Sequence, residues 1–133
     1  MNIKSYTDLS QSKKLAEILP LESADMHYST WTILDGEFIV SPNQGSTIEE
    51  LREDYGNQII PCWSLAALSA FILPSVADDE GNNYKFYLSK DGLDRWVAYY
   101  KCNDVSIHIC EESDNMIDVI FEMICWLLEN KKL

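Results

Sequence analysis

Basic residues are scarce in this sequence. Ten lysines and arginines stand against twenty-two aspartates and glutamates, which gives a net charge of −12 over 133 residues. Sequence-independent binding to nucleic acid depends on lysine and arginine contacts to phosphates, and a negative surface also repels anionic lipid headgroups. The composition therefore predicts no direct binding to nucleic acid and no membrane partner. It is compatible with a basic protein partner or a cation, and equally with a charge that only keeps the protein soluble.

Long apolar segments are also missing. The longest apolar run, Leu65 to Leu73, is interrupted by Ser69 and is far shorter than the roughly 20 residues of a membrane-spanning helix. The first residues, Met1 to Tyr6, lack the apolar stretch of a secretory signal. We therefore expect a cytoplasmic protein whose cysteines are reduced. These cysteines are Cys62, Cys102, Cys110 and Cys125.

Signatures of familiar catalytic and cofactor sites are absent as well. The sequence contains no GxSxG, GxGxxG or GxxxxGK motif, so neither a hydrolase elbow nor a common nucleotide site is indicated. Paired CxxC and HExxH spacings are also missing. The sequence predicts no catalytic residue and no cofactor. Whether the protein is an enzyme stays open, and a non-enzymatic role is favoured.

The weak candidates for a metal site lie near the end of one expected hairpin. His108 and Cys110 are two residues apart on a predicted strand, so both side chains point to one face. Cys102 is expected on the neighbouring strand. Because a structural zinc site needs four ligands, we predict no metal site here. A small metal or Cys–His enzyme centred on His108 remains an alternative.

The hydrophobic and aromatic content of the chain indicates a globular protein. Hydrophobic residues make up 47% of the chain and include four tryptophans and seven tyrosines, whereas disordered acidic chains are poor in aromatics. The length is close to the most common domain size. We predict a single α+β domain over residues 1–133.

Two helices are predicted in the first half of the chain. Thr7 is expected to cap the first helix, which ends before Pro20. A capping-box pattern at residues 46–49 starts a second, short helix that ends at Gly56. Between them, residues 24–34 are interpreted as extended structure or an ordered loop, and a short strand follows at residues 37–40.

The second half of the chain predicts two further helices and a sheet. Residues 61–73, bracketed by two prolines, are apolar almost all round and predict a buried helix. A long C-terminal helix is expected from Ser113 to about Asn130. Between these helices, a loop at residues 75–83 precedes three strand-like runs that form an antiparallel meander over residues 84–110. The predicted fold is an antiparallel sheet of three or more strands packed against both helices.

Two surfaces are candidates for interaction with a partner. Aromatic residues crowd two adjacent strands of the predicted meander, and tyrosine and tryptophan are enriched at protein interfaces. The aromatic candidates are Tyr87, Trp96 and Tyr99. Acidic residues also form a stripe on the last helix at helical periodicity. The acidic candidates are Asp114, Asp118 and Glu122.

Four sequence blocks together resemble a group of small acidic proteins encoded by gut bacteria and by their phages or prophages. The blocks are Gln11 to Pro20, Glu22 to Met26, Ile60 to Leu68 and Cys125 to Asn130. These motifs are structural in type, and the group has no assigned activity. The resemblance therefore implies a mobile-element accessory protein and contributes no catalytic residue.

The sequence leaves three functional hypotheses. We favour a non-enzymatic intracellular interaction protein, or an accessory protein of phage origin, that acts on an unidentified protein partner and is itself a monomer or weak homodimer. The first alternative is an acidic nucleic-acid mimic that inhibits a DNA-binding protein, which requires carboxylates spaced like phosphates. The second is the small metal or Cys–His enzyme centred on His108.

Overall fold

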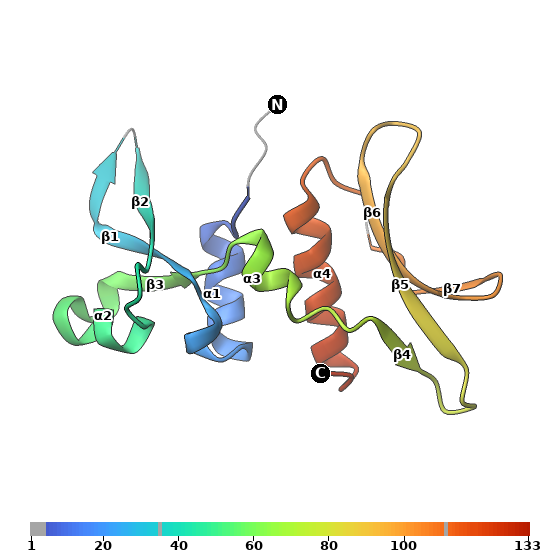
Figure 1. Cartoon of the computed structure of the whole chain (residues 1–133). Coiled ribbons are helices and arrows are strands. Elements are labelled where there is room, and N and C mark those ends of the chain that lie inside the picture. The colour runs from blue at the N-terminus through green and yellow to red at the C-terminus, as the bar shows by residue number, and fades with distance from the viewer. Residues whose placement is uncertain (1–4, 35, 111) are drawn as a thin grey trace. The chain divides into compact units, whose positions relative to one another are not determined.

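The structure is a computed structural model that describes residues 5–34, 36–110 and 112–133. The chain forms two compact units, which we call the N-terminal unit (Ser5–Ala67) and the C-terminal unit (Leu68–Leu133). Each unit combines an antiparallel sheet with helices (Figure 1), so the predicted α+β class is confirmed. The single domain expected for residues 1–133 stays a prediction.

The N-terminal unit is built on a three-stranded sheet in the order β2-β1-β3. Its central strand lies in residues 24–34, for which the sequence predicted either extended structure or an ordered loop. Two α-helices and two short 3₁₀ helices complete the unit. The elements are α1 (Leu9–Ile18), η1 (Leu21–Ser23), β1 (Met26–Leu34), β2 (Glu37–Pro42), α2 (Ile48–Tyr55), η2 (Gly56–Gln58) and β3 (Ile59–Cys62).

The helix starts in this unit lie one residue later than predicted. Asp8, and not Thr7, caps α1 through a reciprocal capping box with Gln11. Thr7 instead is fully buried and joins a hydrogen-bonded network. Thr47 caps α2 by accepting a hydrogen bond from the Glu50 amide. The predicted end of α2 at Gly56 is confirmed, and Gly56 has a positive φ of 65°.

The predicted buried helix over residues 61–73 is wrong. Residues Ile59–Cys62 form β3, which pairs antiparallel with β1, and only Leu65–Ser69 are helical (α3). The two β-branched isoleucines before Pro61 favour a strand. Because β3 is an edge strand of its sheet, it is a place where a sheet tolerates a proline, which has no amide hydrogen to donate. The apolar pattern could not separate a buried strand from a buried helix.

The C-terminal unit contains a four-stranded antiparallel sheet in the order β4-β5-β6-β7. The meander and the long C-terminal helix are confirmed. The sequence missed β4 because three residues are too few to show alternation. The elements are β4 (Ser75–Ala77), β5 (Asn83–Lys90), β6 (Trp96–Cys102), β7 (Val105–Ile107) and α4 (Met116–Glu129).

One face of this sheet packs on α4 (Figure 1). Every second residue of β5 and β6 enters the core, as the two-residue period of a strand requires. The buried residues of this core are Val76, Tyr84, Ala98, Tyr100, Cys110, Val119, Met123 and Leu127. The Tyr100 hydroxyl donates a 2.7 Å hydrogen bond to the Leu73 carbonyl, which ties the segment before β4 to the core.

The strand β7 and the helix α4 differ from the predicted bounds by a few residues. β7 ends at Ile107 instead of residue 110, because His108 has a positive φ of 42° that a strand cannot contain. α4 begins at Met116. Before the helix, the Ser113 hydroxyl donates a hydrogen bond to the Asp118 carboxylate. No helix among the described residues is long and apolar enough to cross a membrane.

Candidate functional site

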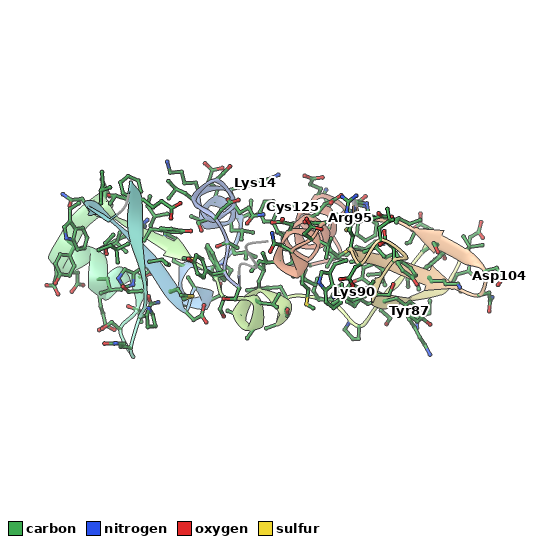
Figure 2. All side chains as sticks on the ribbon, turned by 90° about the horizontal axis from the view of Figure 1, so that it is seen from above. Lys14, Tyr87, Lys90, Arg95, Asp104 and Cys125 are labelled. Atoms are coloured by element: carbon green, nitrogen blue, oxygen red, sulfur yellow. The ribbon has the colours of Figure 1, made fainter. Side chains whose placement is uncertain are left out.

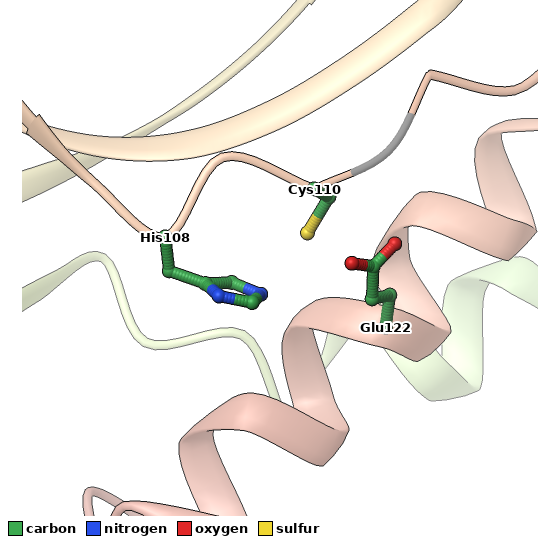
Figure 3. Close-up of side chains that lie close together, drawn as sticks. All are labelled: His108, Cys110 and Glu122. Carbon is green, nitrogen blue, oxygen red and sulfur yellow. The ribbon is translucent and has the colours of Figure 1, made fainter.

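A histidine, a cysteine and a glutamate meet in the C-terminal unit. His108 and Cys110 lie in the segment between β7 and α4, and Glu122 lies on α4. One ligand atom from each residue lies within 4.8 Å of the other two. Figure 3 shows the imidazole ring, the thiol and the carboxylate converging on one point. We call these three residues the His–Cys–Glu cluster.

His108 is held in this cluster at a cost to stability. Its left-handed backbone conformation (φ 42°) costs about 1 kcal/mol or more in a residue other than glycine. Its ring stacks on Trp126 at 4.8 Å between centroids and 11° between planes. Among the described residues, Nε2 of His108 is the one buried side-chain nitrogen or oxygen without a hydrogen-bond partner. Burial lowers the pKa of His108, and the charges of Glu122 and Glu129 oppose that shift.

Cys110 contributes a buried thiol. Its backbone amide donates a 2.9 Å hydrogen bond to the Ala98 carbonyl of β6, which anchors the segment beyond β7 to the sheet. Burial, together with the nearby charge of Glu122, raises the pKa of the Cys110 thiol to about 12. The thiol is therefore protonated at neutral pH. Cys110 also lines a shallow open hollow with Arg95, Val97, Ile109 and Glu112.

The spacing on α4 explains how Glu122 reaches the other two residues. Glu122 and Trp126 are four residues apart, so they occupy the same helix face. Trp126 supports the His108 ring by stacking, while Glu122, one turn earlier, presents its carboxylate to the same ring. One helix face thus both orients the imidazole and supplies an oxygen ligand.

The structure brings together two of the three metal candidates that the sequence proposed. His108 and Cys110 are neighbours in the cluster, but Cys102 does not belong to it. Cys102 packs against the core at the end of β6, paired with Val105 of β7. The third member, Glu122, came from the acidic stripe and was assigned to another role. Its distance of twelve residues from Cys110 hid the contact, and only the packing of α4 on the sheet reveals it.

The acidic stripe itself is partly engaged. Asp118 accepts a 2.9 Å hydrogen bond from the Ser113 hydroxyl, and Glu122 belongs to the His–Cys–Glu cluster. Asp114 is exposed just before α4. Two of the three acidic candidates on this stripe therefore take part in local contacts.

The other face of the same sheet carries a compact set of aromatic and basic side chains. Tyr87 of β5 pairs directly with Tyr99 of β6, and Lys85 pairs with Lys101. The two tyrosine rings stack at 5.6 Å between centroids and 16° between planes. Their neighbours along each strand point to α4, so these four residues share the face turned away from the core. We call this surface the tyrosine–lysine face.

This face is locally basic in an acidic protein. Neither Lys85 nor Lys101 forms an ion pair with any residue that the structure describes, although like charges directly opposite each other destabilise a sheet. Tyr87 is 44% exposed, and Figure 2 labels its position in the sheet of the C-terminal unit. The sequence singled out the two tyrosines but not the lysines, whose position became evident only from the register of β5 with β6.

Trp96, the third aromatic candidate, lies on the opposite side of the sheet. It packs partly buried against the core, and Lys90 stands over its ring at 5.0 Å. The aromatic surface predicted from the sequence therefore contains Tyr87 and Tyr99 without Trp96. The two-residue period explains the difference, because positions 96 and 99 must point to opposite faces.

The comparisons with known proteins add no functional assignment to this geometry. No family model matches the chain, nor does any curated protein or solved structure.

Proposed function

We propose that the protein is a non-enzymatic binding protein that takes an acidic segment of a partner protein on the tyrosine–lysine face. The observation that carries this proposal is the pair of opposed lysines beside a stacked tyrosine pair in which Tyr87 is exposed and Tyr99 is half-buried. In this proposal the protein acts in the cytoplasm. The proposal agrees with an accessory role in a phage or prophage, which the sequence resemblance implies.

The charge of the face supports an acidic partner. The two opposed lysines repel each other when the face is bare, so a carboxylate placed between them relieves that repulsion and gains two charge-assisted contacts. The remaining acidic surface repels such a partner at a distance. At 0.1 M salt, however, charges more than about 10 Å apart are largely screened, so the local lysines determine the contact.

The tyrosine pair supports a protein segment as the partner. Tyrosine provides a large contact area with little conformational entropy to lose, and exposed tyrosines often dominate binding energy. A segment with an apolar or aromatic side chain next to a carboxylate would use both parts of the face. Two lysines are few for a nucleic-acid strand, whose binding depends on many phosphate contacts.

Selection from a random peptide library displayed on phage tests this proposal, because it does not require the partner to be identified first. Peptides are selected on the wild-type protein and then tested on a Tyr87→Ala/Tyr99→Ala variant. We expect retained sequences that combine aspartate or glutamate with an apolar residue, and at least tenfold weaker binding to the variant. Neutral or basic consensus sequences, or equal retention by the variant, would contradict the proposal.

A matched pair of lysine variants tests the charge argument. Lys85→Gln removes a cation from the tyrosine–lysine face, whereas Lys90→Gln removes one from the same strand, where the side chain lies over Trp96 and pairs with Asp94. The selected peptides should bind Lys85→Gln more weakly and Lys90→Gln about as well as wild type. An oligo(dT) strand serves as the second probe. Binding of this strand that depends on Lys85 would assign the face to nucleic acid instead.

A further inference from the structure

The His–Cys–Glu cluster lies on the side of the sheet that packs on α4, and the proposed partner binding does not involve it. Its three side chains come from the segment after β7 and from α4, and they point at one another. Such a convergence needs an explanation, because His108 keeps a left-handed backbone and a buried nitrogen without a partner. Neither feature gains stability for the fold.

We propose that His108, Cys110 and Glu122 form a three-ligand binding site for a zinc ion. Nε2 of His108, Sγ of Cys110 and one carboxylate oxygen of Glu122 are the ligands. With three protein ligands, the fourth tetrahedral position is open to a water molecule.

The distances fit a zinc ion after a small adjustment. Zinc binds nitrogen, oxygen and sulfur at about 2.0–2.3 Å, so two ligands of a tetrahedral ion lie roughly 3.3–3.7 Å apart. The ligand atoms of the cluster are at most 4.8 Å apart. Glu122 is only partly buried on α4, and binding of zinc requires the ligand atoms that lie farthest apart to approach by about 1 Å.

The kinds of ligand favour zinc over other cations. Magnesium and calcium prefer an all-oxygen shell, whereas a thiolate and an imidazole suit zinc. The orphan Nε2 gains its missing partner when it binds the ion. As the sulfur–zinc bond forms, the Cys110 thiol releases its proton to solvent.

The surroundings of the cluster hold two of the three ligands in place. Stacking on Trp126 fixes the plane of the His108 ring, and the hydrogen bond from the Cys110 amide to Ala98 fixes the thiol against β6. Interactions of this kind around the ligands orient them for the metal.

Calorimetric titration of zinc into the reduced, chelator-treated full chain tests the site. We expect one zinc ion per chain, with at least tenfold weaker binding in Glu122→Gln and in His108→Phe. Both variants keep the shape of the side chain, and their thermal unfolding without metal serves as the check that they are folded. Glu49→Gln, at an exposed acid of α2 in the N-terminal unit, and Cys102→Ser should bind zinc like wild type.

Cobalt substitution provides a second reading that identifies the thiol. Cobalt bound to a thiolate gives a sulfur-to-metal charge-transfer band in the near ultraviolet. Cys110→Ser should abolish this band, although the cysteines at 62, 102 and 125 remain. The proposal is overturned if the wild-type chain binds no stoichiometric zinc, or if binding and the cobalt band survive in His108→Phe and Cys110→Ser.

Discussion

A buried cysteine in the N-terminal unit and one in the C-terminal unit have different surroundings. In the N-terminal unit, the Cys62 thiol donates to the Thr7 carbonyl, and the Thr7 hydroxyl shares a 2.7 Å hydrogen bond with Ser12. The Trp63 amide and the Tyr28 hydroxyl both donate to Thr7 as well. In the C-terminal unit, Cys110 faces an imidazole with an unpaired nitrogen and a carboxylate.

This contrast separates a structural thiol from a candidate ligand. Burial raises the pKa of both thiols, so the pKa shift alone does not distinguish them. Hydrogen bonds from Thr7 and Ser12 partly oppose the shift at Cys62. Buried polar groups that have hydrogen-bond partners stabilise a fold. A buried nitrogen without a partner, beside a thiol and a carboxylate, indicates a site for a ligand.

The largest expected effect concerns the core of the N-terminal unit. Trp63 is fully buried, and Trp63→Ala should lower the free energy of unfolding by about 3–5 kcal/mol. Trp31, which is 46% exposed and stacks on Tyr55, provides the control, and its alanine variant should cost about 1 kcal/mol. Urea denaturation measures both. Equal losses for the two variants would mean that Trp63 does not anchor this core.

A pair of shape-preserving substitutions tests the contrast between the two polar groups. Thr7→Val removes a hydroxyl that has three hydrogen-bond partners and should cost about 1–3 kcal/mol, because the Trp63 amide, the Ser12 hydroxyl and the Cys62 sulfur lose their bonds to it. His108→Phe removes an unpaired nitrogen and should change the stability of the metal-free protein by less than about 1 kcal/mol.

Thermal unfolding of both variants without metal gives this comparison. If His108→Phe destabilised the chain as much as Thr7→Val, His108 would be a structural residue, and the surroundings of Cys62 and Cys110 would be equivalent in kind.

The hydroxyl of Tyr100 makes a smaller contribution. It donates to the Leu73 carbonyl, and Tyr100→Phe should cost about 1 kcal/mol by leaving that carbonyl without its partner. Tyr28→Phe is the matched variant in the N-terminal unit, because its hydroxyl donates to the Thr7 carbonyl. Equilibrium denaturation should give similar losses. A loss confined to one unit would show that this kind of bond is not a common feature of both.

How far the sequence predicted the fold depended on the length of each pattern. The helix α4 and the strands β5 and β6 were predicted correctly because each is a long run of residues with a consistent pattern. The segment around Pro61 was not, because an apolar run without alternation is consistent with both a helix and an edge strand. The cluster could be predicted only in part, since His108 and Cys110 are close in sequence while Glu122 arrives through tertiary packing.

The smallest expected effect appears at acid pH. Asp78 accepts hydrogen bonds from the amides of Glu80 and Asn82, and from the Asn82 side chain. These bonds lower the pKa of Asp78 below its usual value of 3.8, with the Asn82 side chain as the largest cause. A lowered pKa in the folded state stabilises the fold above pH 3.8, and this contribution is lost as the pH falls through the pKa of the folded state.

Asp78→Asn should therefore reduce the pH dependence of stability below about pH 4, and Asp79→Asn should leave it unchanged. Thermal unfolding across pH 2 to 6 measures the effect. An unaltered acid profile in Asp78→Asn would contradict a structural role for the Asp78 carboxylate.

The contrast between the two cysteines is tested most directly by amide NMR spectra of the ¹⁵N-labelled, reduced chain during zinc addition. We predict that the amide shifts change around residues 107–112 and 118–126, with saturation at one zinc ion per chain, while the amides of Thr7, Ser12 and Cys62 stay in place. Changes centred on the exposed acids of α2 or on the Asp78 loop, or no saturable change at all, would contradict the account.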